Sequence, residues 1–346
     1  MARIMYGVHG TGHGHAIRAL AVARMFPEHE FLFVSHGDGL AILNREYRVI
    51  ECPNPETVVA AHRVAATATA IRLLRFGTGR KPLRQSIRKA FDQFRPDAAI
   101  ADYEYFVPIA AHETGIRCLS LDHQHVIPLC GAAVPWFRYP DFLATVGALR
   151  CLFSAANEFL VTSFFQPPRT GKARVFPPLL RPSVLRRVPR AGEHVLAYQG
   201  YSTFARYLPF LKKIRRPVVV YGLNRTGRDG NLLFKPPGEE AFLDDLSTCR
   251  YVVCGGGHSL ISEALHYGKP VLSLPIRYAI EQYLNAWHVR HLGYGAMLQA
   301  ENPSEASLAE FEAGLDGFQK RIRSVSFCGN DAIAAELRRF IAGDIR

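Results

Sequence analysis

Short hydrophobic runs alternate with longer amphipathic stretches along the whole chain. In the first half, five such runs are typical of strands, at residues 3–8, 30–35, 98–101, 117–121 and 158–162. The segments between them carry apolar residues at helical spacing. Strands that alternate with helices predict an α/β protein built on a doubly wound parallel sheet.

A proline-rich, basic passage between residues 166 and 189 interrupts this alternation. Its prolines disfavour a regular helix and a central strand, so we expect an interdomain linker there. Strand-like runs then restart, at residues 194–199, 217–221, 231–234, 251–254 and 271–274. The pattern predicts an N-terminal domain over residues 1–180, a linker at 181–192, a second Rossmann-like domain over 193–330 and an amphipathic helix within 331–346.

The run at 251–254 ends in three glycines at 255–257, which lead into a helix-like pattern. Glycine lets the backbone turn sharply and lets a ligand approach its N–H groups, and a helix N-terminus favours negative charge. Glu263 follows Ser259 by four residues, on the same helix face and roughly 6 Å further along the axis. A diphosphate at the helix tip would therefore leave a ribose within reach of the Glu263 carboxylate.

The same segment carries spaced motifs: G-x-S-x-x-S-E-A from Gly257, G-K-P from Gly268 and P-x-x-x-x-x-E-Q-x-x-N-A from Pro275. In order and spacing it resembles the donor-binding half of GT-B glycosyltransferases, which use nucleotide sugars. It is most similar to the family 28 type, which includes the enzyme that adds N-acetylglucosamine to the lipid-linked peptidoglycan precursor, and it is similar to UDP-glycosyltransferases. The alternative is a generic βαβ unit with a glycine-rich turn.

The resemblance implies a GT-B fold, in which two Rossmann-like, doubly wound parallel-sheet domains face each other across a cleft. The first domain would bind the acceptor, the second would bind the donor, and the C-terminal helix would cross back to the first. The implied reaction is inverting, metal-independent transfer of a sugar from a nucleoside-diphosphate sugar, by resemblance a UDP-sugar, to a hydroxyl acceptor. No cofactor is expected besides this donor, and the acceptor would be a lipid-linked compound, a cell-envelope glycan or a small molecule.

The first hydrophobic run ends in a turn rich in glycine and histidine, from His9 to His15. It resembles the G-x-G-H loop of GT-B N-terminal domains, with His15 as the matching residue and His13 as the alternative. An imidazole titrates near working pH and can take the proton of an attacking hydroxyl. Asp102 ends a P-D-x-x-x-x-D element and would hold the histidine tautomer. Alternatively, Asp102 caps the following loop and His15 only packs or binds.

Other residues near these strand ends are expected to contact the acceptor: Gly14, His13, Arg18, His123 and His125. An ordinary loop position explains His123 and His125 equally well. Their H-x-H spacing, together with the first histidine turn, also fits a metal site. We expect no metal, because GT-B enzymes typically need none and the D-x-D signature of the metal-dependent class is absent.

The resemblance also implies a set of donor-binding residues. Arg181 and Ser202 would contact the phosphates, although a helix N-cap would explain Ser202 as well. Phe234 would form a wall of the base pocket, and Glu281 with Gln282 would bind sugar hydroxyls, which both donate and accept. The expected donor set is Arg181, Gly200, Ser202, Phe234, Gly256, Gly257, His258, Ser259, Glu263, Glu281 and Gln282.

The formal net charge of +12 implies an acidic partner. Basic residues gather between 63 and 95 among apolar ones, which fits either an anionic membrane surface or a solvated helix face. No aromatic stacking platform accompanies them, so we expect no nucleic-acid binding. The scattered cysteines, with no signal-peptide pattern and no long charge-free run, predict a cytoplasmic protein, at most peripheral on the inner face of the cytoplasmic membrane.

Two other functions share these features. A nucleotide-sugar 2-epimerase has the same two-domain fold, but it should carry an R-x-x-T-E-R-P-E-like run where this chain has Ile276-Arg277-Tyr278-Ala279-Ile280-Glu281-Gln282. A non-catalytic nucleotide-sugar sensor would keep the donor site alone. Release of a nucleoside diphosphate only when an acceptor is present would distinguish the transferase from both.

Overall fold

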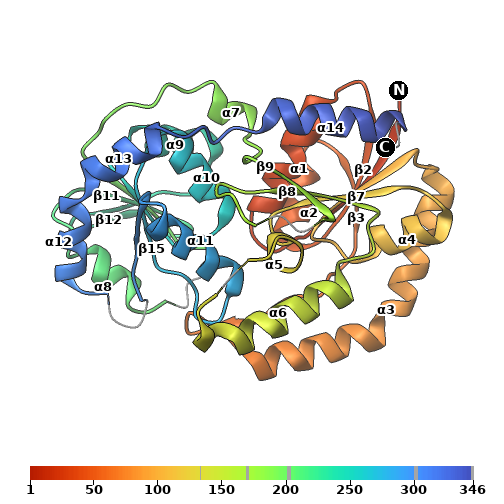
Figure 1. Ribbon diagram of the computed structural model, residues 1–346, viewed down its shortest axis with the longest axis horizontal. Coiled ribbons are helices and arrows are strands. Elements are labelled where there is room, and N and C mark those ends of the chain that lie inside the picture. Colours follow the sequence, from red (N-terminus) through yellow and green to blue (C-terminus); the bar gives the residue numbers. More distant parts are fainter. Residues whose placement is uncertain (133, 169–170, 201–203, 300–302, 344–346) are drawn as a thin grey trace. The chain divides into compact units, whose positions relative to one another are not determined.

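The computed structural model of the 346-residue chain describes all residues except 133, 169–170, 201–203, 300–302 and 344–346. The chain divides into two compact units (Figure 1). Unit 1 comprises Met1–Val58, Ala66–Arg181 and Gly329–Arg346, and unit 2 comprises Val59–Ala65 and Pro182–Cys328.

Unit 1 is built on a seven-stranded parallel sheet. Its spatial order is β3 (Arg48–Glu51), β2 (Glu30–Ser35), β1 (Arg3–Val8), β6 (Ala98–Asp102), β7 (Cys118–Asp122), β8 (Glu158–Thr162) and β9 (Ala173–Phe176). Its helices are α1 (Gly14–Met25), α2 (Gly37–Leu43), α3 (Ala66–Phe94), α4 (Phe106–Thr114), α5 (Val126–Leu129), η1 (Trp136–Arg138), α6 (Tyr139–Leu152) and α14 (Asn330–Ala342). The chain order reverses between β1 and β6, and such a switch point in an α/β sheet opens a crevice for ligands.

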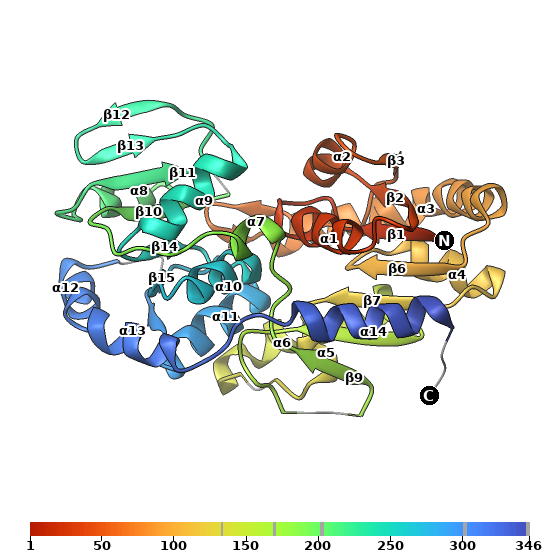
Figure 2. The same cartoon turned by 90° about the horizontal axis from the view of Figure 1, so that it is seen from above.

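The core of unit 1 joins segments from both ends of the chain. Ile4, Tyr6 and Val8 of β1 pack in one buried cluster with apolar residues of α1 and α2, and with Ile333, Leu337 and Phe340 of α14. The Arg117 guanidinium donates a hydrogen bond of 2.7 Å to the Phe340 carbonyl. Figures 1 and 2 show α14, in dark blue, lying along this sheet beside the early elements.

Unit 2 is built on a second seven-stranded sheet. Its spatial order is β12 (Gly227–Asp229), β13 (Leu232–Phe234), β11 (Val218–Tyr221), β10 (Val195–Tyr198), β14 (Val252–Cys254), β15 (Val271–Ser273) and β16 (Gly295–Met297). All neighbours are parallel except β12 and β13, and the chain order reverses between β10 and β14. Its helices are α7 (Pro182–Leu185), α8 (Tyr207–Leu211), α9 (Glu239–Thr248), α10 (His258–His266), α11 (Ile280–His291), α12 (Glu305–Ala313) and α13 (Leu315–Arg323).

A short hairpin, β4 (Val59–Ala60) and β5 (Arg63–Val64), belongs to unit 2 although the residues on both sides of it belong to unit 1. Its turn residues, Ala61 and His62, have left-handed φ angles of 47° and 56°. Two main-chain hydrogen bonds fix the hairpin in unit 2: Val64 N–H to the Arg277 carbonyl at 2.9 Å, and Arg277 N–H to the His62 carbonyl at 3.0 Å. The hydrophobic pattern gave no sign of this attachment.

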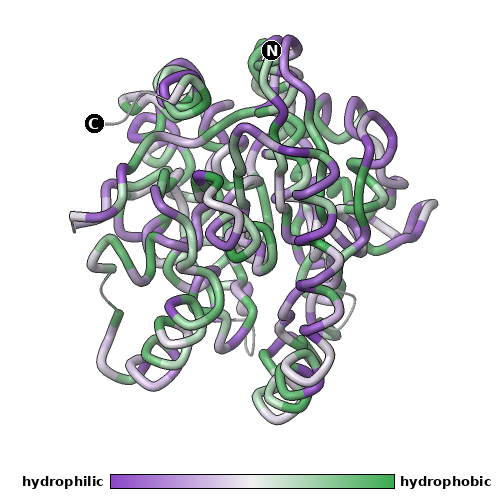
Figure 3. The backbone as a smooth tube through the Cα atoms, turned by 90° about the vertical axis from the view of Figure 1, so that its right-hand side faces the viewer, coloured by the Kyte–Doolittle hydropathy of each residue, from purple (hydrophilic) through white to green (hydrophobic). Residues whose placement is uncertain are grey.

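The predicted fold class is confirmed, because both sheets are doubly wound and mostly parallel. Each of the ten predicted strands has a counterpart within a residue at either end, whereas the short strands β3, β9, β12 and β16 were not predicted. The units differ from the expected domain ranges at four places: residues 59–65 and 182–192 lie in unit 2, whereas Arg181 and residues 329–330 lie in unit 1. Hydrophobic and hydrophilic residues alternate along the outer helices (Figure 3). Within the described residues, no helix is long and apolar enough to span a membrane.

Candidate active site

The carboxyl ends of β1 and β6 lie side by side at the switch point of unit 1. Val8 pairs with Asp102 in the sheet register, and the His9 N–H donates a 2.9 Å hydrogen bond to the Asp102 carbonyl. The loop after β1 and the start of α1 therefore lie directly above the Asp102 side chain. This edge carries the residues that the sequence predicted for catalysis.

His15, Arg18 and Asp102 form one hydrogen-bonded network. The Nδ1 atom of His15 lies 2.7 Å from Asp102 Oδ1. Arg18 donates from Nε to Asp102 Oδ2 at 2.7 Å and from Nη2 to Oδ1 at 2.6 Å. The Asp102 side chain is fully buried, whereas 14% of His15 is exposed. A buried carboxylate thus holds Nδ1 of His15 and leaves Nε2 available for other partners.

Aromatic rings surround this network. The His9 ring centroid lies 5.4 Å from that of His15, 5.3 Å from that of His36 and 4.9 Å from that of Tyr103. His9 is buried and its Nδ1 has no hydrogen-bond partner among the described residues. Burial, followed by the nearby His15 and His36, holds the pKa of His9 well below its usual range. His9 is therefore neutral at neutral pH and contributes a polar but uncharged wall.

The glycines of the first turn have a steric reason. A Cβ on Gly10 would lie 1.9 Å from the His36 carbonyl oxygen, so no larger residue fits there. The Gly10 N–H donates to His36 Nε2 at 3.1 Å, and the Gly12 N–H donates to Asp38 Oδ2 at 3.1 Å. These contacts fix the loop that positions His15. His13 is exposed on this loop and accepts a main-chain hydrogen bond from Ile17 N–H through its carbonyl.

Arg18, His123 and His125, expected to contact the acceptor, are directed into the protein. Arg18 is buried against Asp102. His123 lies 2.7 Å from the Thr162 carbonyl, and His125 lies between Asp122 Oδ2 at 2.6 Å and the Phe153 carbonyl at 3.1 Å. Both imidazoles are at most 2% exposed, and the Asp122 carboxylate, against the effect of burial, raises the pKa of His125. The hydrogen bonds of Arg18, His123 and His125 fix the loops at the carboxyl edge of the sheet. Contacts of these three residues with an acceptor stay predictions.

In unit 2, the glycine-rich turn lies at the sheet's own switch point, after β14. Gly256 has a φ of 132°, and a Cβ there would lie 2.8 Å from the Gln282 carbonyl oxygen. The Asn285 amide donates a 3.0 Å hydrogen bond to the Gly256 carbonyl. Gly257 precedes α10 and offers no side-chain cap. These contacts fix the turn directly before the N-terminus of α10, where helix main-chain N–H groups favour negative charge.

His62 of the hairpin reaches the same edge and was missed by the sequence analysis. Its ring stacks on Phe204 with centroids 4.0 Å apart, and its Nε2 lies 3.1 Å from the Leu274 carbonyl. The Gln199 amide, directly after β10, lies 3.4 Å from His62 Nδ1. Burial lowers the pKa of His62, so the imidazole is neutral at neutral pH. A lone histidine in an irregular segment far from the donor motifs carries no sequence signal for this position.

Most of the remaining expected donor residues lie in unit 2. Glu263 is 5% exposed on α10, and Gln282 Oε1 accepts a hydrogen bond from the Ile276 N–H at 3.1 Å. Phe234 is buried, with the Arg225 guanidinium 4.1 Å from its ring centroid. His258 is buried, Ser259 and Glu281 are half-buried, and Gly200 is exposed. Arg181 is buried at the end of the second segment of unit 1, and Ser202 lies outside the described residues.

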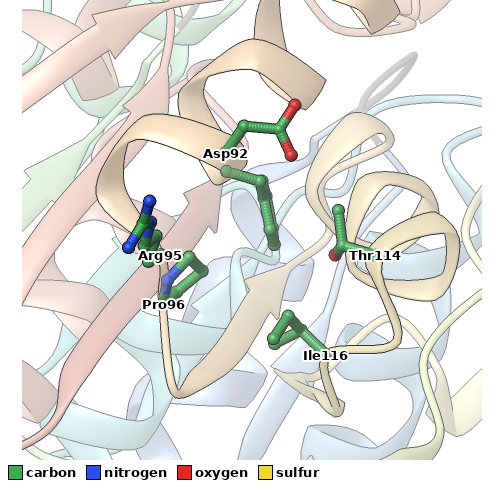
Figure 4. A pocket seen from close by; sticks show the side chains of 6 residues that line it. Asp92, Arg95, Pro96, Thr114 and Ile116 are labelled. Carbon is green, nitrogen blue, oxygen red and sulfur yellow. The ribbon is translucent and has the colours of Figure 1, made fainter.

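Within the described ranges, no three histidine, cysteine, aspartate or glutamate side chains come together as a metal site requires. A hollow of about 440 Å³ in unit 1 lies at the opposite, amino edge of the sheet (Figure 4). Asp92 in the last turn of α3 and Arg95, directly after the helix, line it with Ile116, which precedes β7. None of the predicted site residues lines this hollow.

Comparisons with known proteins agree with this architecture. The family described as glycosyl transferase family 1 matches residues 2–315. A glycosyltransferase of Methanosarcina mazei is 25% identical over 345 residues, which cover 88% of each chain. CalG4, the calicheamicin glycosyltransferase, has a TM-score of 0.69 at 17% identity over the full length of both chains. MurG of Acinetobacter baumannii has a TM-score of 0.60 at 16% identity, covering 98% of this chain and all of its own.

Proposed function

This chain belongs to the glycosyl transferase family 1 and has the GT-B fold, and on that premise we propose that it transfers a sugar from a UDP-sugar to a hydroxyl acceptor. The transfer inverts the anomeric carbon and needs no metal ion. The observation that carries this proposal is the pairing of His15 with the buried Asp102 at the switch point of unit 1.

His15 acts as the general base in this reaction. Asp102 accepts the hydrogen bond from Nδ1–H, so the lone pair of Nε2 is available for the acceptor hydroxyl. As the acceptor oxygen forms its bond to the anomeric carbon, its proton passes to Nε2. The bond from that carbon to the diphosphate oxygen breaks, and its electron pair leaves with the nucleoside diphosphate. The Asp102 carboxylate stabilises the imidazolium that results.

The glycine turn after β14 stabilises the leaving group. Its main-chain N–H groups and the N-terminus of α10 provide fixed dipoles for the charge that develops on the diphosphate. Glu263 binds the ribose, whereas Glu281 and Gln282 bind hydroxyls of the donor sugar. The resemblance assigns further phosphate contacts to Arg181, Gly200 and Ser202, of which Ser202 lies outside the described residues. Uracil is proposed as the base on the resemblance of the donor motifs to those of UDP-glycosyltransferases.

A panel of nucleotide sugars, each incubated with acceptor extracts, tests this function through release of nucleoside diphosphate. The proposal predicts acceptor-dependent release from a UDP-sugar, unchanged by a chelator and lost in His15→Ala. Binding of the donor without turnover across the panel would instead identify a nucleotide-sugar sensor. Conversion of the donor to its 2-epimer without an acceptor would identify the isomerase.

We further propose an acceptor at an anionic membrane, because three helices of unit 1 carry exposed apolar and basic side chains. Trp136 of η1 is 80% exposed, Leu74 of α3 is 72% exposed and Leu143 of α6 is 61% exposed. Arg75 and Lys81 are also exposed on α3, and neither forms an ion pair among the described residues. Both α3 and α6 lie along the lower side of unit 1 in Figure 1.

Apolar side chains that enter the interface and cations near anionic headgroups both stabilise peripheral binding. Sedimentation with phosphatidylglycerol vesicles should therefore pellet the protein, and Trp136→Ser should weaken binding. Equal binding to neutral and anionic vesicles, or none to either, would contradict the membrane proposal and leave the transferase proposal untouched.

A further inference from the structure

A second hollow, of about 340 Å³, lies at the amino edge of the unit 2 sheet. Its walls come from the segment before β10, the turns before β14 and β15, and the end of α13. The lining residues include Arg190, Arg250, His266, Lys269, Gln319 and Arg323. The donor edge, with the glycine turn and Gln199, lies at the opposite ends of the same strands.

The hollow is lined by cations without carboxylates. Arg190, Arg250, Lys269 and Arg323 line it together with His266, and no aspartate or glutamate does. Among the residues that the structure describes, none of these three arginines and the lysine forms an ion pair with a carboxylate. Elsewhere in unit 2 comparable side chains are paired, such as Lys235 with Asp245 at 2.7 Å.

Two of these cations are incompletely satisfied. Lys269 is only 4% exposed, and its ammonium donates a hydrogen bond to the Arg190 carbonyl at 2.5 Å. An ammonium has three donors, so two remain for a ligand or water. The Nε of Arg250 is buried and has no partner among the described residues. Burial lowers the pKa of Lys269, and the nearby Arg323 lowers it further, as expected where a cation has no carboxylate beside it.

We propose that this hollow binds a small anion that carries one or two phosphate groups. Phosphate oxygens accept several hydrogen bonds at once and would supply the negative charge that the lining lacks. The site is distinct from the proposed donor site, because Arg250 and Gly255 stand five residues apart across β14, roughly 16 Å in an extended strand. A phosphate at the hollow would therefore not be the phosphate of the donor.

Calorimetric titration of the full chain with inorganic phosphate and with pyrophosphate at low salt tests this site. Saturable binding is expected, with pyrophosphate tighter than phosphate. Arg323→Ala, on the exposed end of α13, should weaken binding at the hollow by about tenfold, and Lys269→Met should remove the binding that Arg323→Ala weakens. Binding of pyrophosphate at the proposed donor turn would persist in both variants as a separate transition. Lys320→Ala is the matched control, because it removes the same charge from the same helix without touching the hollow.

Three results would overturn the proposal. One is the absence of saturable binding at millimolar anion. Another is equal weakening by Arg323→Ala and Lys320→Ala, which would indicate diffuse electrostatics. The third is loss of binding in Gly256→Val without loss in Arg323→Ala, which would locate the anion at the donor turn. Because Arg323 is exposed, its variant folds even if Lys269→Met does not.

Discussion

Replacing Asp102 by asparagine removes the charge that His15 and Arg18 share. The carboxylate lies 2.7 Å from His15 Nδ1 and accepts two hydrogen bonds from Arg18, at 2.7 and 2.6 Å. An asparagine oxygen can replace Oδ1, which serves both residues, but its amide group then faces the Nε–H of Arg18. The variant therefore keeps the shape of the site, loses the anion and leaves a buried cation unpaired.

Two magnitudes follow from this geometry. Removal of one partner from a buried ion pair costs about 3 to 5 kcal/mol of folding stability. General-base catalysis contributes a factor of about 10² to 10⁴, so a kcat lowered about 10³-fold, or roughly 4 kcal/mol of transition-state stabilisation, is expected. The KM for the donor should change little, because the change lies in unit 1, which carries none of the glycine turn.

Asp122→Asn provides a matched control for this variant. Asp122 is also fully buried at the end of a strand and lies 2.6 Å from a histidine, His125, whose other nitrogen faces a main-chain carbonyl. Urea denaturation should show a comparable loss of stability in both variants, whereas nucleoside diphosphate release should fall strongly only in Asp102→Asn. The reasoning is refuted if folded Asp102→Asn keeps wild-type turnover, or if Asp122→Asn loses as much.

Three further predictions concern other parts of the chain. His62→Phe keeps the stacking on Phe204 but loses both ring nitrogens. The KM for the donor should therefore rise about tenfold with little change in kcat, and a fall in kcat alone would contradict this prediction. Gly256→Ala should lower the free energy of unfolding by about 1 to 3 kcal/mol, because its φ of 132° suits only glycine. Gly257→Ala, with open space at Cβ, should cost less than about 1 kcal/mol. Equal losses of stability for the two variants in urea denaturation would contradict this prediction. Burial raises the pKa of Glu104 from 4.5 to about 7. Between these two pH values the native protein holds a proton that the unfolded chain has lost. The free energy of unfolding should therefore fall by about 3 kcal/mol as the pH rises through this range. Glu104→Gln should flatten that dependence, and an unchanged slope would contradict the assignment.

The hydrophobic pattern was sufficient for the fold because the central strands are buried on both faces. A strand such as β1 or β14 appears as a continuous apolar run, and such runs with helices between them define a doubly wound sheet. The short edge strands β9 and β16 escaped prediction because runs of four and three residues are too short to show a strand period. The glycine turn was recognisable because its residues are contiguous.

The site could be predicted only where its residues follow a local motif. His15 and Asp102 each end a recognisable segment, and the structure brings them within 2.7 Å. Arg18 was assigned to the acceptor because a helix position does not reveal a partner 84 residues away. His62 pairs with the Leu274 carbonyl across 212 residues, and no local spacing encodes such a contact.

The most direct test of the account compares acceptor-dependent release of nucleoside diphosphate in His15→Ala and His13→Ala. Binding of UDP is measured in parallel by calorimetry. If His15 is the general base, His15→Ala loses turnover by about 10² to 10⁴-fold and keeps its affinity for UDP, whereas exposed His13 can be replaced with far less loss. Turnover that survives in His15→Ala, or that disappears only in His13→Ala, would contradict it.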